Sequence, residues 1–332
     1  MRAATHDRYG GSDVVTIAEI DEPVIADNQL LVAVHASSVT TADWRLRASA
    51  FPGGMWLAGR LMTGLSRPRN RVLGMEFSGV VARTGSRVTR FATGDAVFGN
   101  AGSGAHADYL AIDEDGALAA KPPALSHAEA ASLPFGAVTA LVFLRDFARL
   151  KSGQRILIIG ASGGVGVHAV QIARHMGAHV TGVTSTDNVK LVADLGADRV
   201  VDYRKEDLNE IGGNFDLVFD TAGIVRFARA RRLLNADGLF LPLEFGIGDV
   251  LTAIRCAITR SRQRIGLHVS GDAQADVEAI ADMAATGALN PVIDSRYPLS
   301  EIGRAHERVE TRHKRGSVII DVRPDDEAPP AA

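Results

Sequence analysis

The pattern of apolar and polar positions divides the chain into stretches that predict different secondary structure. Up to about residue 125, short runs rich in β-branched residues alternate with Gly, Pro and Asp turn signals, as in VVTIAEI, QLLVAVHASSV, FSGVVA and DAVFG. Short apolar runs between turn residues are typical of β-strands. We therefore expect residues 1–125 to form a compact all-β domain.

From Ser126 onward the pattern changes to strands that alternate with helices. Apolar runs such as RILIIG, HVTGVT, DRVVDY and FDLVFDTAG are separated by helical runs such as VGVHAVQIARHMG and NVKLVADLG, and the stretch begins with SHAEAASLPFGAVTALVFLRDFARL. This alternation predicts parallel strands joined by right-handed crossovers in a doubly wound sheet. The second domain should span residues 126–289, which makes the fold class α/β.

The C-terminal part offers one more helix and a final strand. Both patterns occur in LSEIGRAHERVETRHKRGSVIIDV, and the simplest assembly returns residues 290–322 to the first domain. The tail, residues 323–332, contains prolines and acids but no large apolar residue. Such a composition cannot bury a core, so the tail is expected to be disordered.

The composition narrows the classes of partner. The 332 residues are 46% hydrophobic, and 36 lysines and arginines nearly balance 39 aspartates and glutamates. A chain of this length can bury two cores, while the balanced charge gives no strong field for nucleic acid or an anionic membrane surface. The expected partner is a small molecule or a second copy of the chain, and no nucleic acid.

The cysteine content and the hydropathy exclude further classes. Cys256 is the single cysteine, which excludes an intrachain disulfide and every zinc site built from several cysteines. The N-terminal run MRAATHDRYG has no apolar core of signal-peptide length, and no segment approaches the roughly 20 apolar residues of a spanning helix. We expect a cytoplasmic protein with no membrane span and no metal.

The run GASGGVG, from Gly160 to Gly166, follows the apolar strand ILII and precedes an amphipathic helix. Gly160 permits a tight turn, and Gly166 lets the helix pack against the sheet. Gly163 and Gly164 let a pyrophosphate approach backbone N–H groups at the N-terminus of the helix. The strand before and the helix after this run favour a dinucleotide site over a turn without a ligand.

The end of the next strand bears on which dinucleotide binds. It reads Thr-Ser-Thr at residues 184–186, where an NAD site usually has an acid for the ribose 2′-hydroxyl. Hydroxyl groups can donate to a 2′-phosphate, so NADPH is favoured over NADH. Asp187 is interpreted as the N-cap of the following helix. Lys190 and Tyr203 are candidate contacts of the phosphate, although Lys190 suits a solvated surface position equally well.

These segments resemble a known family. The stretch GASGGVGVHAVQIARHMGAHVTGVTSTDNVKLVADLGADRVVDYRKED is similar to the cofactor core of the zinc-free quinone oxidoreductase branch of the medium-chain dehydrogenase/reductase superfamily, which includes zeta-crystallin-like and reticulon-4-interacting-protein-like proteins. VLGMEFSGVVARTGSRVTRFATGDAVFG, SLPFGAVTALVFLRD and RHKRGSVIIDV extend the likeness over nearly the whole chain. The resemblance implies a GroES-like β domain and a doubly wound Rossmann domain with a parallel sheet.

The resemblance also implies cofactor contacts at matching positions. It assigns the pyrophosphate to the glycine-rich run, the adenosine end to Ser185 and Tyr203, and further contacts to Thr139 near the nicotinamide and to the run HKR near the C-terminus. With the residues inferred above, the candidate cofactor-binding residues are Thr139, Ser162, Gly163, Gly164, Val165, Gly166, Ser185, Lys190, Tyr203, His313, Lys314 and Arg315.

The wider superfamily also contains zinc enzymes, in which a cysteine and a His-Glu pair hold the catalytic metal. The corresponding stretches here, ASSVTTADW and GMEFSG, contain neither cysteine nor histidine. The resemblance therefore implies hydride transfer from NADPH without zinc, which needs an acceptor that is already electrophilic, such as a quinone or an enone. Thr40 and Asp43 are the candidate catalytic residues, and Asp43 is equally interpretable as a helix cap.

A quinone oxidoreductase is the expected function. A reductase of alkenals or other enones stays open, because it needs the same site, and so does a non-catalytic NADPH-binding interaction protein. The resemblance implies homodimers paired at the Rossmann sheet edge, near LFLPLE and LHVS, although the sequence leaves the oligomeric state open. Four residues are candidates for an apolar substrate wall or for ordinary packing: Trp44, Met55, Trp56 and Met62.

Overall fold

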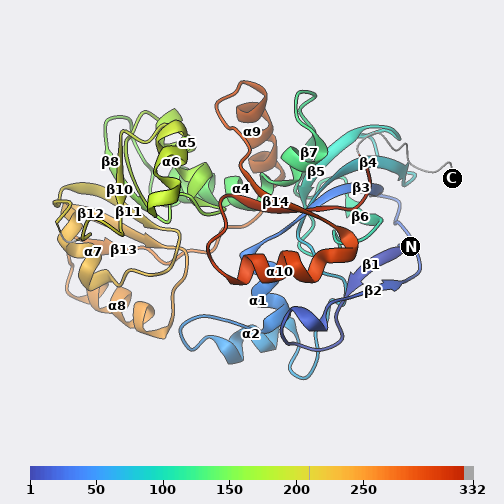
Figure 1. Cartoon of the computed structure of the whole chain (residues 1–332), viewed down its shortest axis with the longest axis horizontal. Coiled ribbons are helices and arrows are strands. Elements are labelled where there is room, and N and C mark those ends of the chain that lie inside the picture. Colours follow the sequence, from blue (N-terminus) through green and yellow to red (C-terminus); the bar gives the residue numbers. More distant parts are fainter. Residues whose placement is uncertain (209, 325–332) are drawn as a thin grey trace.

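The computed structural model describes residues 1–208 and 210–324, which form two domains that lie side by side (Figure 1). The early strands, in blue and teal, occupy the right-hand part of the view, and the alternating strands and helices of the second domain occupy the left. Helix α4 (Pro134–Val142) lies between them. The α/β fold class predicted from the sequence is confirmed.

The first domain is built on a seven-stranded sheet of order β14-β15-β3-β4-β5-β7, with β6 paired to β3. Its pairs are antiparallel except for the parallel pair β14–β15. A separate antiparallel pair is formed by β1 and β2. The bounds are β1 (Arg2–Thr5), β2 (Thr16–Glu19), β3 (Gln29–Val39), β4 (Glu76–Thr84), β5 (Ala96–Asn100), β6 (Tyr109–Asp113), β7 (Leu118–Ala120), β14 (Ile293–Pro298) and β15 (Ser317–Asp321).

The C-terminal segment enters this sheet. β15 pairs antiparallel with β3, and helix α10 (Ile302–Glu310) covers the same core with Ile302, Ala305 and Val309. These three positions recur at a spacing of three and four residues, which puts them on one helix face. The C-terminal segment therefore returns to the first domain, while the boundaries at residues 125/126 and 289/290 stay predictions.

The second domain contains a six-stranded parallel sheet of order β10-β9-β8-β11-β12-β13. The strand order reverses between β8 and β11, and in such sheets the ligand crevice lies at the carboxyl ends of the strands at this switch point. The bounds are β8 (Arg155–Ile159), β9 (His179–Thr184), β10 (Arg199–Asp202), β11 (Phe215–Asp220), β12 (Leu234–Pro242) and β13 (Arg264–Ile265).

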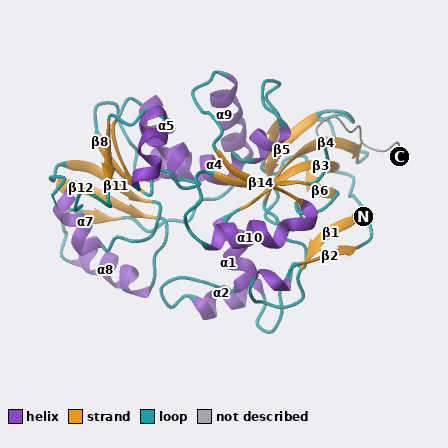
Figure 2. Cartoon of the chain, in the orientation of Figure 1, coloured by secondary structure: helices purple, strands orange, loops and turns teal. Residues whose placement is uncertain are grey.

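Helices lie on both faces of this sheet, as Figure 2 shows for α5 and α7. Helices α6 and α8 also pack against strands of this sheet. The helix bounds not given above are α1 (Thr41–Ala48), α2 (Trp56–Thr63), α3 (His127–Ala131), α5 (Gly166–His175), α6 (Val189–Asp194), α7 (Phe227–Leu233), α8 (Ile247–Ile258) and α9 (Gln274–Ala285).

The run that begins at Ser126 is split into three pieces rather than forming one helix. Ser126 caps α3 in a capping box with Glu129. Pro134 opens the separate helix α4, because proline lacks the N–H that a continuing helix would need but fits the first turn of a new one. A π-helical turn at Phe143–Phe147 completes the run.

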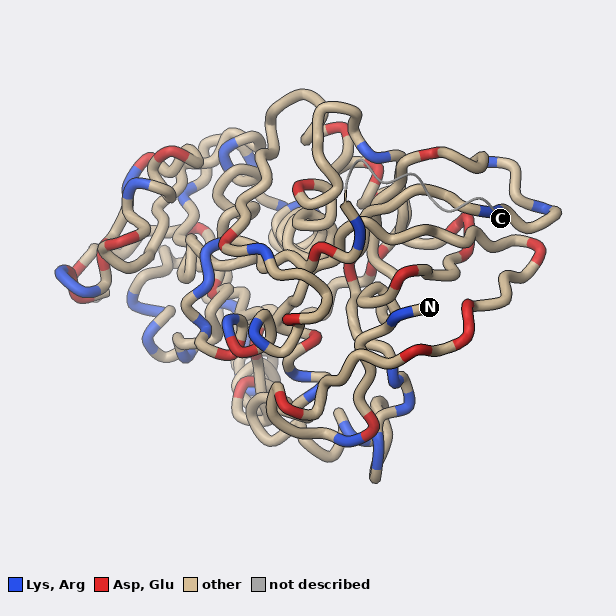
Figure 3. The backbone as a smooth tube through the Cα atoms, turned by 45° about the vertical axis from the view of Figure 1, so that its right-hand side comes forward, with Lys and Arg blue, Asp and Glu red and all other residues tan. Residues whose placement is uncertain are grey.

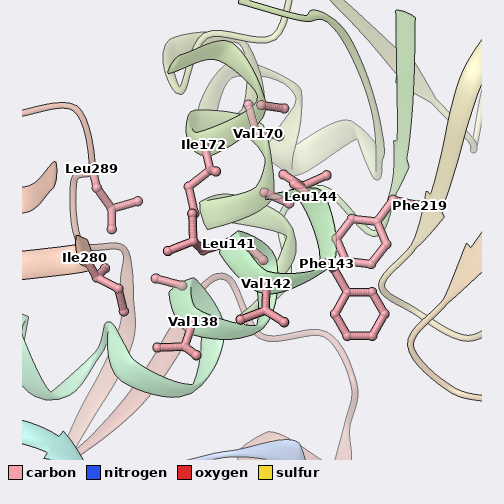
Figure 4. Packing of buried hydrophobic residues seen from close by; sticks show 14 of the residues in the cluster. Val138, Leu141, Val142, Phe143, Leu144, Val170, Ile172, Phe219, Ile280 and Leu289 are labelled. Atoms are coloured by element: carbon pink, nitrogen blue, oxygen red, sulfur yellow. The ribbon is translucent and has the colours of Figure 1, made fainter. Parts of the chain in front are cut away.

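The largest core joins α4, α5 and the sheet. Val138, Leu141 and Val142 of α4 belong to this core, and Figure 4 shows Leu141 beside Ile172 of α5. At the end of this cluster the rings of Phe143 and Phe219 stack, with centroids 5.4 Å apart. Close packing of this kind fixes α5, and with it the glycine-rich turn that precedes α5, against the sheet.

The tail predicted to be disordered falls largely outside the described residues, which end at Pro324. The first two tail residues hold contacts: the Arg323 N–H donates to the His35 carbonyl at 3.1 Å, and the His35 ring lies 2.9 Å from the Pro324 carbonyl oxygen. The prediction for residues 325–332 is untested.

Candidate functional site: a dinucleotide crevice between two domains

The glycine-rich turn lies at the carboxyl end of β8, in the position where a doubly wound sheet binds its ligand. Gly160 has φ +78°, a left-handed conformation that side chains other than glycine adopt rarely. A Cβ on Gly166 would collide with the Gly160 carbonyl oxygen. The structure therefore has the tight turn at Gly160 and the close approach of α5 at Gly166 that the sequence predicted.

Ser162 ties this turn to the neighbouring strand β9. Its Oγ accepts from the Thr184 hydroxyl at 2.8 Å and from the Asn188 side-chain amide at 3.1 Å. Asn188 also donates to Ser185 Oγ at 3.2 Å. Because Ser162 is the acceptor in both of its bonds, its own hydroxyl hydrogen is left to donate to a ligand oxygen.

Lys314 brings a positive charge to the turn from the C-terminal segment. Its Nζ donates to the Gly316 carbonyl at 2.6 Å, and the Gly316 N–H donates to the Ser162 carbonyl at 3.0 Å. A Cβ on Gly164 would lie only 2.5 Å from this Nζ. Burial lowers the Lys314 pKa to about 8, against the opposing effect of Glu76, so the ammonium is mostly charged at pH 7.

Glu76 is a buried carboxylate on β4 that the sequence analysis did not select. Its Oε1 accepts the Phe135 N–H at 2.6 Å, at the N-terminus of α4, and its Oε2 accepts the Ser38 hydroxyl. Burial raises the Glu76 pKa to about 7, partly offset by these bonds and by Lys314. The signal available in the sequence was an acid inside the otherwise apolar strand GMEFSGVV.

The other two residues of the HKR run are held differently from Lys314. His313 is exposed, and its ring contacts the Thr311 carbonyl. Arg315 is also exposed, and its backbone N–H donates to Asp294 at 2.7 Å. Of the three, Lys314 is the one with an atom against the glycine-rich turn, and the cofactor contacts of His313 and Arg315 stay predictions.

Ser185 and Tyr203, which are expected at the adenosine end of the cofactor, directly follow the neighbouring strands β9 and β10. The Tyr203 N–H donates to the Thr184 carbonyl at 3.1 Å, and the Tyr203 side chain is exposed. Lys190 is exposed and pairs with Asp194 at 2.7 Å, one helical turn away, which matches its interpretation as a solvated surface residue. Its contact with a phosphate stays a prediction.

The N-cap role expected for Asp187 is wrong. Asp187 lies inside a short 3-10 helix, Thr186–Asn188, whose N-cap is Ser185. Its carboxylate instead lies 3.3 Å from the guanidinium of Arg204. Sequence reasoning missed Arg204, although a cation directly after Tyr203 was visible as a candidate partner for a 2′-phosphate.

Thr40 and Asp43 form the capping box that begins α1. Asp43 Oδ2 accepts from the Thr40 N–H at 2.8 Å and from the Thr40 hydroxyl at 2.7 Å, while Thr40 Oγ accepts the Asp43 N–H at 3.1 Å. Asp43 Oδ1 accepts the Gly74 N–H at 3.2 Å. This geometry is that of a helix cap, and a catalytic role for the two residues stays a prediction.

A cavity of about 160 Å³ lies beside this cap. Tyr9, Asp43, Leu46, Met62 and Arg69 are among its lining residues. Of the other proposed wall residues, Trp44 packs against the core of the first domain and Trp56 is 52% exposed. Thr139 is buried on α4 with its hydroxyl 3.4 Å from Ser270 Oγ.

The comparisons with known proteins agree with this architecture. The chain is 32% identical over 334 residues to the chloroplastic quinone-oxidoreductase homolog of Spinacia oleracea, an alignment that covers 97% of this chain and 98% of the relative. The chain belongs to the quinone oxidoreductase branch of the medium-chain dehydrogenase/reductase superfamily. Residues 26–123 of this superfamily member match the alcohol dehydrogenase GroES-like domain, and residues 195–320 match the family described as zinc-binding dehydrogenase.

Two further similarities refine this placement in the superfamily. The solved quinone oxidoreductase from Coxiella burnetii superimposes with a TM-score of 0.84 at 30% identity, covering 97% of this chain and 99% of that one. The NADPH-dependent alkenal/one oxidoreductase of Arabidopsis thaliana is 28% identical over 96% of this chain and 79% of its own length. The resemblance inferred from the sequence is confirmed.

In this chain, a charged cluster centred on Glu244 joins the two domains. Glu244, just after β12, lies 2.5 Å from Arg45 of α1 and 2.7 Å from Arg312. Arg312 also donates to the Ala222 carbonyl beyond β11 at 2.8 Å. The sequence analysis missed this cluster because its members lie far apart along the chain and no motif connects them.

Within residues 1–208 and 210–324, no group of three or more His, Cys, Asp or Glu side chains is arranged to hold a metal ion. In the same ranges no helix combines the length and the apolar composition that crossing a bilayer requires.

Proposed function

We propose that the chain is a zinc-independent oxidoreductase that transfers hydride from NADPH to a quinone. The observation that carries the proposal is the Lys314 ammonium beside Gly164, just before the N-terminus of α5 in the doubly wound domain. Backbone N–H groups and a cation at one turn are the recognition elements of a dinucleotide pyrophosphate. The names of the relatives support both the cofactor and the acceptor.

The residues at the crevice suit NADPH. Gly163 and Gly164 have no side chain to cover their backbone N–H groups, and the free hydroxyl hydrogen of Ser162 and the ammonium of Lys314 are further donors for phosphate oxygens. Val165 is the third candidate at this turn. At the adenosine end, Ser185 and Arg204 are donors for a 2′-phosphate. When bound, NADPH supplies the hydride, and the protein supplies its position and electrostatic surroundings.

The acceptor class follows from the residues that replace the family's zinc ligands. The stretches ASSVTTADW and GMEFSG, where the resemblance places the zinc ligands of other members, contain neither cysteine nor histidine, and Thr40 of the first stretch is engaged in the helix cap. Hydride transfer without a Lewis acid requires an acceptor whose developing negative charge is already delocalised. Quinones meet this requirement, and enones meet it as well.

Reduction of an alkenal or enone is the second candidate, because one relative is named as an NADPH-dependent alkenal/one oxidoreductase. The two candidates differ in acceptor and not in cofactor site. A panel of one ortho-quinone, one para-quinone and one alkenal, each followed by NADPH absorbance with EDTA present, ranks them. If NADPH is consumed with the alkenal and with neither quinone, the chain is an alkenal reductase and the quinone assignment is wrong.

The cytoplasmic location, the homodimer and the absence of a nucleic-acid partner stay predictions. Size-exclusion chromatography with light scattering tests the oligomeric state directly. A monomer at all concentrations would contradict the pairing of subunits that the family resemblance implies.

A further inference from the structure

Helix α8 exposes an apolar stripe. Its outward positions recur at the helical spacing, and no residue of this helix is fully buried. The stripe consists of Ile247, Val250, Leu251, Ile254 and Ile258, which are 37 to 77% exposed. Soluble surfaces rarely carry a contiguous apolar area of this kind without a partner.

Helix α2 carries a second apolar group beside the first. Trp56, Leu57, Leu61, Met62 and, just after the helix, Leu65 are 52 to 77% exposed. The two groups adjoin, because the Ile247 N–H donates to the Gly53 carbonyl at 3.1 Å just before α2. Figure 1 shows both helices along the lower side of the molecule. We call these ten residues the α2–α8 surface.

The charges around the α2–α8 surface are predominantly positive. Six arginines and no aspartate or glutamate occur between Trp44 and Met75, namely Arg45, Arg47, Arg60, Arg67, Arg69 and Arg71. From α8 to residue 264 there are four more arginines and one acid, Asp249, whose carboxylate caps the helix by accepting the Gly246 N–H at 3.0 Å.

Several of these arginines are exposed and not neutralised. Arg71 pairs with Asp7, and Arg45 pairs with Glu244. Four other arginines of these two segments have exposed side chains, namely Arg67, Arg69, Arg255 and Arg260. Within the described parts of the chain, none of these four forms an ion pair. The net charge of the whole chain is −3, so it does not reveal this local excess of positive charge. Over much of the rest of the chain, acids and bases are interspersed, as Figure 3 shows.

We propose that the α2–α8 surface docks on an anionic lipid bilayer. Apolar helices that carry Trp and Leu, flanked by unpaired arginines, match the headgroup region of such a bilayer, where apolar side chains enter the acyl boundary and arginines meet lipid phosphates. The mode is peripheral, in keeping with the absence of a spanning helix among the described residues.

The charge pattern favours a bilayer over a second copy of the chain. A symmetric dimer through this surface would place the same arginine-rich patch of both copies face to face, which is unfavourable. Anionic headgroups would neutralise them instead. The docking proposal does not depend on the proposed reaction, because it is measured without acceptor or cofactor.

The test is co-sedimentation of the full chain with vesicles of phosphatidylcholine alone or with about 30 mol% phosphatidylglycerol. We expect binding to the anionic vesicles only, with at least about fivefold weaker binding in about 0.5 M NaCl. No sedimentation with the anionic vesicles would overturn the proposal.

Variants test whether vesicle binding depends on the α2–α8 surface and not on other parts of the molecule. Leu57→Ser with Leu61→Ser, and Arg67→Glu with Arg69→Glu, should each weaken binding at least about tenfold. The matched control is Val24→Ser, since Val24 is 93% exposed but lies outside the surface, and its binding should equal that of the parent chain. An equal loss in the control would contradict the assignment of the surface.

Sedimentation velocity without vesicles tests whether a second copy of the chain, rather than a bilayer, covers the α2–α8 surface. We expect Ile254→Ser with Ile258→Ser to leave the oligomeric state unchanged while it weakens vesicle binding. A dimer that dissociates in this variant, with vesicle binding unchanged, would assign the surface to a second copy and overturn the proposal. Circular dichroism and melting temperature identify any variant that fails to fold, and the arginine pair then serves in its place.

Discussion

At the scale of single residues, the site depends on a few side chains whose neighbours set their charge. Lys314 lies against Gly164 with a pKa lowered by burial to about 8, and Asp43 has both oxygens engaged at the start of α1. The sequence predicted that both residues matter. It did not distinguish them, because the difference lies in which atoms each side chain meets after folding.

Lys314→Met tests the ammonium. Loss of one charge-assisted bond to phosphate corresponds to about 1.5–3 kcal/mol, so the Kd for NADPH should rise about 10- to 100-fold while kcat changes little. Exposed Lys190→Met is the control, with a Kd within about twofold. Isothermal titration calorimetry measures both, and an unchanged Kd in Lys314→Met would remove this residue from the cofactor site.

The pH dependence of binding follows from the same group. The Lys314 pKa is lowered from its ordinary value to about 8, so the residue is charged below that pH and loses its proton above it. The Kd for NADPH should therefore rise as the pH increases from 7 to about 9. In Lys314→Met this rise should disappear, and a rise of the same size in the variant would assign the titration to another group.

Asp43→Ala separates the cap from catalysis. Removing a capping carboxylate with three backbone and hydroxyl partners should lower the free energy of unfolding by about 2–3 kcal/mol, measured by urea denaturation. The kcat of the variant that remains folded should fall less than about tenfold. A loss of more than about a hundredfold in kcat without a change in stability would establish the catalytic role instead.

At the scale of elements, the pattern of apolar positions was sufficient for the parallel sheet and for the turn between β8 and α5. It was insufficient for the run after Ser126, where Pro134 divides one apolar pattern into two helices. It also did not reveal that α8 exposes its apolar face, because periodicity indicates an amphipathic helix without identifying what covers it.

Gly166→Ala tests the close approach of α5 to the turn. The added Cβ would collide with the Gly160 carbonyl oxygen, so the helix must shift. Overpacking of this kind costs about 1–3 kcal/mol of stability, and NADPH binding should weaken more than tenfold. Gly248→Ala on α8 is the matched control, because its Cβ would meet no atom within 4 Å. Differential scanning fluorimetry with and without NADPH compares the two.

At the scale of the whole molecule, two domains meet at the cofactor crevice, and residues distant in sequence complete it. Glu244 links Arg45 and Arg312, and Glu76 of the first sheet accepts the Phe135 N–H of α4. The resemblance to a family predicted the two domains. Neither contact was predictable, because each depends on how the domains pack and not on any local pattern.

Glu244→Gln should loosen the junction. The Arg45 pair is largely shielded from solvent, whereas the Arg312 side chain is 44% exposed. Loss of both pairs should lower the free energy of unfolding by about 1–3 kcal/mol, with most of the effect from the Arg45 pair. The exposed pair Asp237–Arg262 offers the control, since Asp237→Asn should change stability by less than about 0.5 kcal/mol. Equal midpoints of urea unfolding for the two variants would show that the cluster does not couple the domains.

The most direct test of the central claim is NADPH absorbance with the purified chain, in EDTA, against quinones and an alkenal, with NADH as the cofactor control. We predict acceptor-dependent loss of NADPH absorbance with a quinone, unaffected by the chelator and slower with NADH. If no acceptor is reduced while NADPH still raises the melting temperature, the site binds the cofactor without turnover and the proposed reaction is wrong.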